Sequence, residues 1–211
     1  VTVKGTEAYG DFHFTTKKER SHTIPVYGLY ADADNTVILS DESGAESRVI
    51  IRTKPLPDLV KRPAYVKENG PHMAEQLMFL SPTSDALIAG YDYRGDCRWY
   101  CSLNIVFAIH RLANGNILIG TERLVAPPYN TSGLYEMSLI GKIYTEYRIP
   151  GSYHHDHAEL PNGDIIALTQ DLGSGSVEDV VVLLDRRTGD VKKTWDLKDV
   201  LPMGAGAVSR N

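Results

Sequence analysis

Short apolar runs separated by polar turn residues are the main pattern along this chain. Such runs occur in NTVILS at Asn35–Ser40, SRVIIR at Ser47–Arg52, NGNILIGT at Asn114–Thr121 and NGDIIALT at Asn162–Thr169. Gly, Asn, Asp or Ser flank them, which is typical of β-strands joined by tight turns. VYGLY at Val26–Tyr30 is a further strand-like run, whereas Met73–Leu80 is compatible with a short helix or a strand. The pattern predicts an all-β fold.

The second half of the chain repeats with a period of about 48 residues. NGNILIGT recurs as NGDIIALT at an offset of 48, and LYEMSLIGKIYTEYRI at 134–149 recurs as VVLLDRRTGDVKKTWDL at 181–197. An earlier copy is LIAGYDYRGDCRWY at 87–100. Turn glycines recur as Gly95, Gly141 and Gly189, and aromatic residues recur as Trp99, Tyr147 and Trp195. Four short antiparallel strands per repeat match a β-propeller blade.

These repeats predict a small amino-terminal β domain at residues 1–57 followed by a partial β-propeller at 58–211. The proline-punctuated segment Lys54–Pro63 marks the boundary, because proline does not continue a central strand. A β-sandwich is the alternative, although it does not require a long repeat. About three blades are expected, and a propeller needs at least four to close. We therefore expect a piece of a longer protein, or a homo-oligomer formed through exposed blade edges.

Composition and charge exclude several classes of protein. The 211 residues are 42% hydrophobic and 23% charged, and the apolar runs are too short for a membrane span. The net charge of −5 with no basic stripe makes nucleic acid an unexpected partner.

No signal peptide is visible, although Val1 follows no methionine and a leader is expected to have been removed or omitted. Cys97 and Cys101 are four apart, and only a turn or bulge would let them form a disulfide.

Three histidines and two acidic residues lie together at 154–159, before the apolar run at 165–169, in GSYHHDHAELPNGDIIALT. Interpreted as a strand, this stretch places His155 and His157 on one face and His154 on the other. The 48-residue alignment puts His155 opposite Phe107 and His157 opposite Ile109. Inner strands line the channel of a propeller, so His155 and His157 are the candidate catalytic residues. The alternatives are histidines that satisfy backbone groups, or one metal ion shared by both rings and an acidic neighbour.

Several motifs together resemble the bacterial arylsulfate sulfotransferases that work without a nucleotide sulfate donor. They are IPVYGLY at 24–30, KPLP at 54–57, GDCRWY at 95–100, ANGNILIGT at 113–121, IPGSYHHDHAELPNGDI at 149–165, EDVVVLLDRRTG at 178–189 and KTWDLKDVLP at 193–202. The resemblance implies a six-bladed propeller with a channel rich in histidine. One histidine becomes transiently sulfated in that family, and other histidines, an asparagine and an arginine hold the sulfuryl oxygens.

The resemblance implies transfer of a sulfuryl group from an aryl sulfate ester to a phenol acceptor, without a cofactor or metal, in the periplasm. The HHDHAELPNG block supplies one channel histidine, for which His155 is the first candidate and His157 the second. The family's later motifs, including the histidine that accepts the sulfuryl group, correspond to sequence after Asn211, so we expect this chain to be inactive alone. A non-catalytic propeller module for binding or scaffolding is the alternative.

Overall fold

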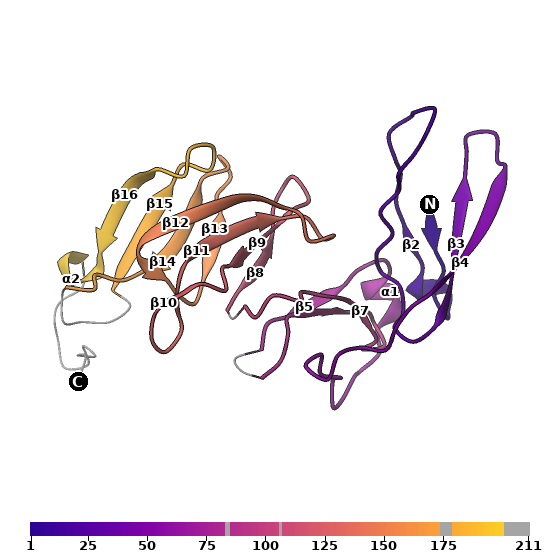
Figure 1. Ribbon diagram of the computed structural model, residues 1–211, viewed down its shortest axis with the longest axis horizontal. Helices are drawn as coiled ribbons and strands as arrows, with labels where there is room; N and C mark the ends of the chain where they lie inside the picture. Colours follow the sequence, from indigo (N-terminus) through magenta and orange to yellow (C-terminus); the bar gives the residue numbers. More distant parts are fainter. Residues whose placement is uncertain (83–84, 106, 174–178, 201–211) are drawn as a thin grey trace. The chain divides into compact units, whose positions relative to one another are not determined.

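The fold is nearly all β. The computed structural model describes residues 1–82, 85–105, 107–173 and 179–200, in four antiparallel sheets with very little helix (Figure 1). The chain divides into two compact units, Val1–Ser102 and Leu103–Asn211, which are described separately below. Glu178 and Leu201–Pro202, which lie in two of the motifs quoted above, fall outside the described residues.

The first sheet of unit 1 has the order β2-β1-β3-β4. It consists of β1 (Thr2–Val3), β2 (Phe12–His13), β3 (Asp34–Ser40) and β4 (Glu46–Arg52), with the 3₁₀ helix η1 (Ala8–Gly10) between β1 and β2. The runs predicted as strands at 35–40 and 47–52 are confirmed. The strand predicted at Val26–Tyr30 is wrong, because the Asn35 side chain bonds both the N–H and the carbonyl of Tyr30 in place of a neighbouring strand.

The second sheet of unit 1 has the order β5-β6-β7 and carries the earliest copy of the repeat. Its strands are β5 (Met78–Leu80), β6 (Ala89–Tyr91) and β7 (Cys97–Tyr100), and the short helix α1 (Gly70–Met73) precedes them. The ambiguous segment at 73–80 thus contains the end of a helix and a strand. Lys54–Pro63 contains no strand, as its prolines predicted. The proposed domain boundary after Pro57 lies within unit 1 and stays a prediction.

Arg98 on β7 joins the two sheets of unit 1. Its buried guanidinium donates to Asp92 Oδ2 at 2.8 Å, to the Gly28 carbonyl at 2.8 Å and to the Gly10 carbonyl at 3.2 Å. The same group lies 3.7 Å from the centre of the Tyr30 ring, a cation–π contact. A single charged side chain therefore ties the amino-terminal segments to the β6–β7 hairpin.

Unit 2 holds two consecutive copies of the repeat. The first copy contains β8 (Ile109–Arg111), β9 (Ile117–Gly120), β10 (Leu124–Ala126), β11 (Asn130–Met137) and β12 (Ile143–Tyr153). The second contains β13 (His157–Glu159), β14 (Ile165–Thr169), β15 (Val180–Leu184) and β16 (Val191–Asp196), followed by the helix α2 (Leu197–Val200). The pairing β8-β9-β11-β12 in one sheet corresponds to β13-β14-β15-β16 in the other. These sheets are blades of an incomplete β-propeller.

The repeat predicted from the sequence holds at the level of single residues. The turn glycines Gly95, Gly141 and Gly189 have positive φ angles of 80°, 85° and 80°. The aromatic residues Trp99, Tyr147 and Trp195 lie on β7, β12 and β16, the last strand of each copy. The 48-residue period therefore reflects a repeated hairpin.

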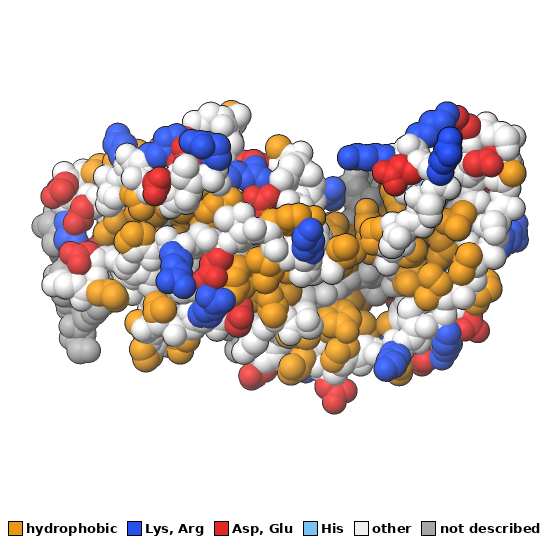
Figure 2. All heavy atoms as spheres, turned by 45° about the horizontal axis from the view of Figure 1, so that its top comes forward, with side chains coloured by type: hydrophobic (Ala, Val, Ile, Leu, Met, Phe, Trp, Pro, Cys, Tyr) orange, Lys and Arg blue, Asp and Glu red, His pale blue; other side chains and the backbone are white. Residues whose placement is uncertain are grey.

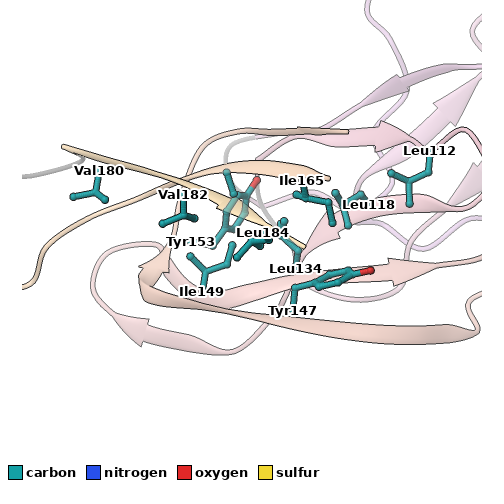
Figure 3. Packing of buried hydrophobic residues seen from close by; sticks show 11 residues of the cluster. Leu112, Leu118, Leu134, Tyr147, Ile149, Tyr153, Ile165, Val180, Val182 and Leu184 are labelled. Atoms are coloured by element: carbon teal, nitrogen blue, oxygen red, sulfur yellow. The ribbon is translucent and has the colours of Figure 1, made fainter. Parts of the chain in front are cut away.

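The core of unit 2 lies between its two sheets (Figure 3). On β14 and β15 burial alternates with a period of two, so that Ile165 and Ala167 pair with Leu184 and Val182 on the buried face. The other blade contributes Leu118, Leu134 and Tyr147, and the loop residue Leu112 completes that side. Burial of each large apolar side chain contributes about 1.5–3 kcal/mol.

An ion-pair cluster also joins the blades of unit 2. Arg186, in the β15–β16 turn, donates to both carboxylate oxygens of Glu136 on β11, at 3.0 and 2.8 Å, and pairs with Glu159 on β13. Asn114 and Asn116 donate to Glu136 as well. Burial acts to raise the pKa of Glu136, but the hydrogen bonds from Arg186 and the two asparagines outweigh it and lower that pKa to about 2.

The surface combines mixed charges with exposed apolar side chains. Positive and negative side chains are interspersed with apolar ones on the face shown in Figure 2. The exposed apolar residues include Ile50 on β4, which is 61% exposed, and Leu124 on β10, which is 57% exposed. β4 and β16 end the strand order of their sheets. Pairing of subunits through such edges stays a prediction.

Cys97 and Cys101 are both buried and unbridged. Burial raises the pKa of the Cys97 thiol, which lowers the fraction of reactive thiolate. We expect the native chain to react with a thiol reagent such as dithionitrobenzoate about 100-fold or more slowly than the chain unfolded in guanidinium, because both sites must open first. Titration should give two thiols in the unfolded chain; fewer than two without a reductant would mean that a disulfide forms.

Candidate functional site

The histidine stretch lies between two strands of unit 2. β12 ends at Tyr153 and β13 begins at His157, and His155 between them has a φ of 59°. The N–H of Asp156 donates to the carbonyl of His154 at 2.9 Å, which closes a tight turn. The prediction that His155 and His157 share one face of a continuous strand is wrong, because this turn breaks the alternation. His154 and His157 are buried instead, and His155 is exposed.

His157 lies within the interface between the blades. Its Nε2 is 3.0 Å from the Leu118 carbonyl on β9, and its Nδ1 is 2.8 Å from the Tyr153 hydroxyl. A carbonyl only accepts, so Nε2 carries the hydrogen and Nδ1 accepts from Tyr153. Burial lowers the pKa of His157 to about 4 and raises that of Tyr153. His157 is therefore a neutral imidazole with both nitrogens bonded to protein groups.

His154 is 1% exposed. Its Nε2 lies 2.9 Å from the Thr169 carbonyl at the end of β14, and its Nδ1 lies 3.1 Å from Nδ1 of His155. The backbone N–H of His154 donates to the Leu168 carbonyl at 3.3 Å. Both the ring and the main chain of this residue are thus held by β14.

His155 stacks on aromatic neighbours. Its ring lies 4.7 Å from that of Phe107, nearly parallel, and the Tyr129 ring meets it edge-on at 5.3 Å. Phe107 is also the residue that the repeat aligns with His155, and its φ of 73° is positive as well. The backbone N–H of Ala108 donates to the His155 carbonyl at 3.2 Å. Corresponding turns of adjacent blades therefore contact each other and present one exposed imidazole.

Asp156 connects this turn to β8. Its Oδ1 lies 2.9 Å from Nε2 of His110 and accepts the backbone N–H of His157 at 2.8 Å. Burial acts to raise the pKa of Asp156, but the hydrogen bonds from His110 and His157 outweigh it and lower that pKa. The ionised carboxylate orients the turn.

Comparison with known proteins identifies the family. The profile of the arylsulfotransferase (ASST) family matches residues 63–209. The chain belongs to the arylsulfotransferase family. The match begins within unit 1, covers most of unit 2 and includes the turn that carries His155. The family model therefore covers more than half of the chain.

Other comparisons are more distant. No curated protein sequence matches this chain at a significant level. A crystal structure of a protein of unknown function from Bacteroides caccae is similar at 15% identity, with a TM-score of 0.43. The similarity covers 81% of this chain and 60% of that one, so the chain spans less than two thirds of the length of that protein.

The described residues contain no helix that is both long and apolar enough to cross a membrane. The same residues contain no group of three or more His, Cys, Asp or Glu arranged to hold a metal ion. The alternative in which His155 and His157 share a metal ion has no geometric support, because both nitrogens of His157 already bond protein groups.

Sequence reasoning missed several neighbours of His155 in the candidate site. It aligned Phe107 with His155 but did not predict that the two rings stack. No sequence pattern pointed to Tyr129, because its position depends on the loop before β11. The role of His154 was missed as well, since the assumed strand placed it away from His155. The shared position in the repeat could have identified Phe107, because equivalent turns of adjacent blades lie side by side.

Proposed function

We propose that this chain provides part of the active site of an extracytoplasmic arylsulfotransferase that moves a sulfuryl group from an aryl sulfate ester to a phenol. One observation carries the proposal: within the family match, the turn after β12 presents the exposed imidazole of His155 against Phe107 and Tyr129. The aromatic rings offer apolar contact to an aryl group, and the imidazole can bond a sulfuryl oxygen or transfer a proton.

The proposed reaction has two steps and passes through a sulfo-histidine. In the first step a histidine nitrogen forms a bond to sulfur while the bond between sulfur and the aryl oxygen breaks, and the departing aryloxide takes a proton from an acid. In the second step the acceptor phenol gives up its proton, its oxygen bonds the sulfur, and the nitrogen–sulfur bond breaks. We assign to His155 a hydrogen bond to a sulfuryl oxygen and the exchange of this proton.

The chain supplies only part of such a site in this proposal. A sulfuryl group has three oxygens that need donors as charge develops, and His155 provides one. The remaining donors and the histidine that becomes sulfated are assigned to further repeat units. His157, the second sequence candidate, supports the site from within the blade interface, since both of its nitrogens are engaged.

The test measures release of 4-nitrophenol from 4-nitrophenyl sulfate with phenol as acceptor, in the full-length protein that contains this chain. His155→Ala should lower kcat/KM by about 100-fold, the usual effect of losing a catalytic donor or acid. His72→Ala, which replaces an exposed histidine of α1, is the matched control and should retain activity. Initial rates with both substrates varied should show ping-pong kinetics.

Two outcomes would reject this function. Equal rates for His155→Ala and the wild type would remove His155 from the site. Binding of 4-nitrophenyl sulfate by the full-length protein, with no release of nitrophenol under any condition, would instead favour a binding module without turnover.

A further inference from the structure

The pair His154 and His155 has a geometry that determines where its hydrogens lie. Nε2 of His154 contacts the Thr169 carbonyl at 2.9 Å, and a carbonyl oxygen only accepts. Nε2 of His154 therefore carries a hydrogen. Nδ1 of the same ring lies 3.1 Å from Nδ1 of His155, so one hydrogen must lie between these two nitrogens.

Burial decides which ring supplies that hydrogen. His154 is 1% exposed, and transfer of a charged ring from water into the protein interior is costly. His154 is therefore neutral and presents a lone pair at Nδ1. His155 is exposed to solvent and donates its Nδ1–H to that lone pair.

We propose that His154 is a positioning residue that keeps a hydrogen on Nδ1 of His155, so that Nε2 of His155 is the nitrogen that gains and loses a proton. Free histidine prefers the opposite neutral tautomer, with the hydrogen on Nε2, and the pair must override this preference. The catalytic consequence rests on the proposed function, whereas the tautomer does not.

The chemistry then follows from the position of Nε2, the ring nitrogen farther from the main chain. In the protonated ring, Nε2–H bonds a sulfuryl oxygen and then passes its proton to the aryloxide as the bond between sulfur and oxygen breaks. Nε2 next takes the proton of the acceptor phenol, so protons balance over the cycle. A neutral partner at Nδ1 orients the ring throughout, as a buried partner orients a catalytic histidine in other enzymes.

The carbonyl that holds His154 is itself fixed. The Thr169 hydroxyl donates to the Pro150 carbonyl at 2.6 Å, and Thr169 pairs with Val180 on β15. Gly151, just before the histidines, leaves no room for a side chain, because an added Cβ would lie 1.8 Å from the Gln170 carbonyl. β12 and β14 thus approach closely where the relay from Thr169 through His154 to His155 begins.

Long-range ¹H–¹⁵N NMR of the ¹⁵N-histidine-labelled chain tests the inference, with His155 assigned from the signals lost in His155→Gln. In the neutral ring of His155, Nδ1 should show the chemical shift of a protonated nitrogen and Nε2 that of an unprotonated one. His154→Asn retains an acceptor near Nδ1 and should keep this pattern. His154→Phe removes the acceptor and should shift His155 towards the Nε2–H tautomer.

An Nε2–H pattern for His155 in the wild type would overturn the inference, and so would an unchanged pattern in a folded His154→Phe. If His154→Phe does not fold, the tautomer pattern of His155 in the wild type and in His154→Asn still tests the inference. In the full-length protein kcat should fall at least about 10-fold in His154→Phe and be largely retained in His154→Asn. If the full-length protein shows no turnover but His155 shows the Nδ1–H pattern, the proposed function is rejected and the tautomer is established.

Discussion

Arg98→Met is expected to lower the free energy of unfolding of unit 1 by about 3–5 kcal/mol, because removal of one partner leaves the other as an uncompensated buried charge. The side chains of Arg98 and Asp92 are 0% and 2% exposed. The Gly28 and Gly10 carbonyls would lose their donor as well. Methionine approximates the length of the arginine stem, so the effect reports mainly the lost charge and hydrogen bonds.

The measurement is urea unfolding followed by tryptophan fluorescence in a Trp195→Phe background, so that Trp99 on β7 reports on unit 1. Arg94→Met is the matched control: Arg94 pairs with exposed glutamates, and such pairs contribute about 0–1 kcal/mol. A double variant, Arg98→Met with Asp92→Leu, should recover part of the loss, since no charge then stays buried without a partner. Equal midpoints for Arg98→Met and Arg94→Met would contradict the role assigned to Arg98.

The sequence predicted the blades because the information that specifies them is local. Turn glycines and alternating apolar residues recur within each copy, and the hairpins form at the expected places. The 48-residue alignment even placed Phe107 and His155 at equivalent turns. What joins the copies is not local: Arg98 meets Gly10 and Gly28 across 88 and 70 residues, and Arg186 meets Glu136 across 50. No spacing rule connects residues so far apart.

The candidate site shows the same limit. Composition and the repeat singled out the histidine stretch, but the prediction of its faces assumed a continuous strand. His155 adopts a positive φ, and this turn changes the faces on which its neighbours lie. His154 is buried beside it, and His157 lies in the interface between the blades. Turns of this kind at non-glycine residues are uncommon and depend on surrounding contacts. The carbonyls of Thr169 and Leu118, which select the tautomers of His154 and His157, are supplied by neighbouring strands.

Arg186→Met is expected to destabilise unit 2 by about 3–5 kcal/mol at neutral pH, and this loss should shrink in acid. Glu136 and Glu159 are 9% and 14% exposed, and both would lose their cation. The wild-type pKa of Glu136 is about 2, below its ordinary value of 4.5. A lowered carboxylate pKa gives stability that is present above about pH 4.5 and is lost as the pH falls towards 2.

In Arg186→Met the carboxylate stays buried without its guanidinium, so its pKa should rise and the carboxyl should be protonated readily. The difference in unfolding free energy between wild type and variant should therefore be largest where Glu136 is ionised in both folded proteins, begin to fall as the pH drops through the raised pKa of the variant, and continue to fall towards pH 3. The buried His157 also makes the folded protein less stable in acid, because its pKa is lowered to about 4. This loss is the same in wild type and variant, so it cancels in the difference. Urea unfolding at several pH values, followed through Trp195 in a Trp99→Phe background, measures the difference.

The adjacent Arg187→Met is the matched control, since Arg187 is exposed and its backbone N–H, which the substitution keeps, bonds Asp185. It should change stability by less than about 0.5 kcal/mol, as exposed substitutions usually do. A loss in Arg186→Met that stays the same between pH 7 and pH 3 would show that packing of the stem, and not the ionised Glu136, is what Arg186 contributes. A loss that shrinks as expected means that the pair between Arg186 and the ionised Glu136 joins the two blades and is removed in acid. The apolar contacts between the blades do not depend on this charge.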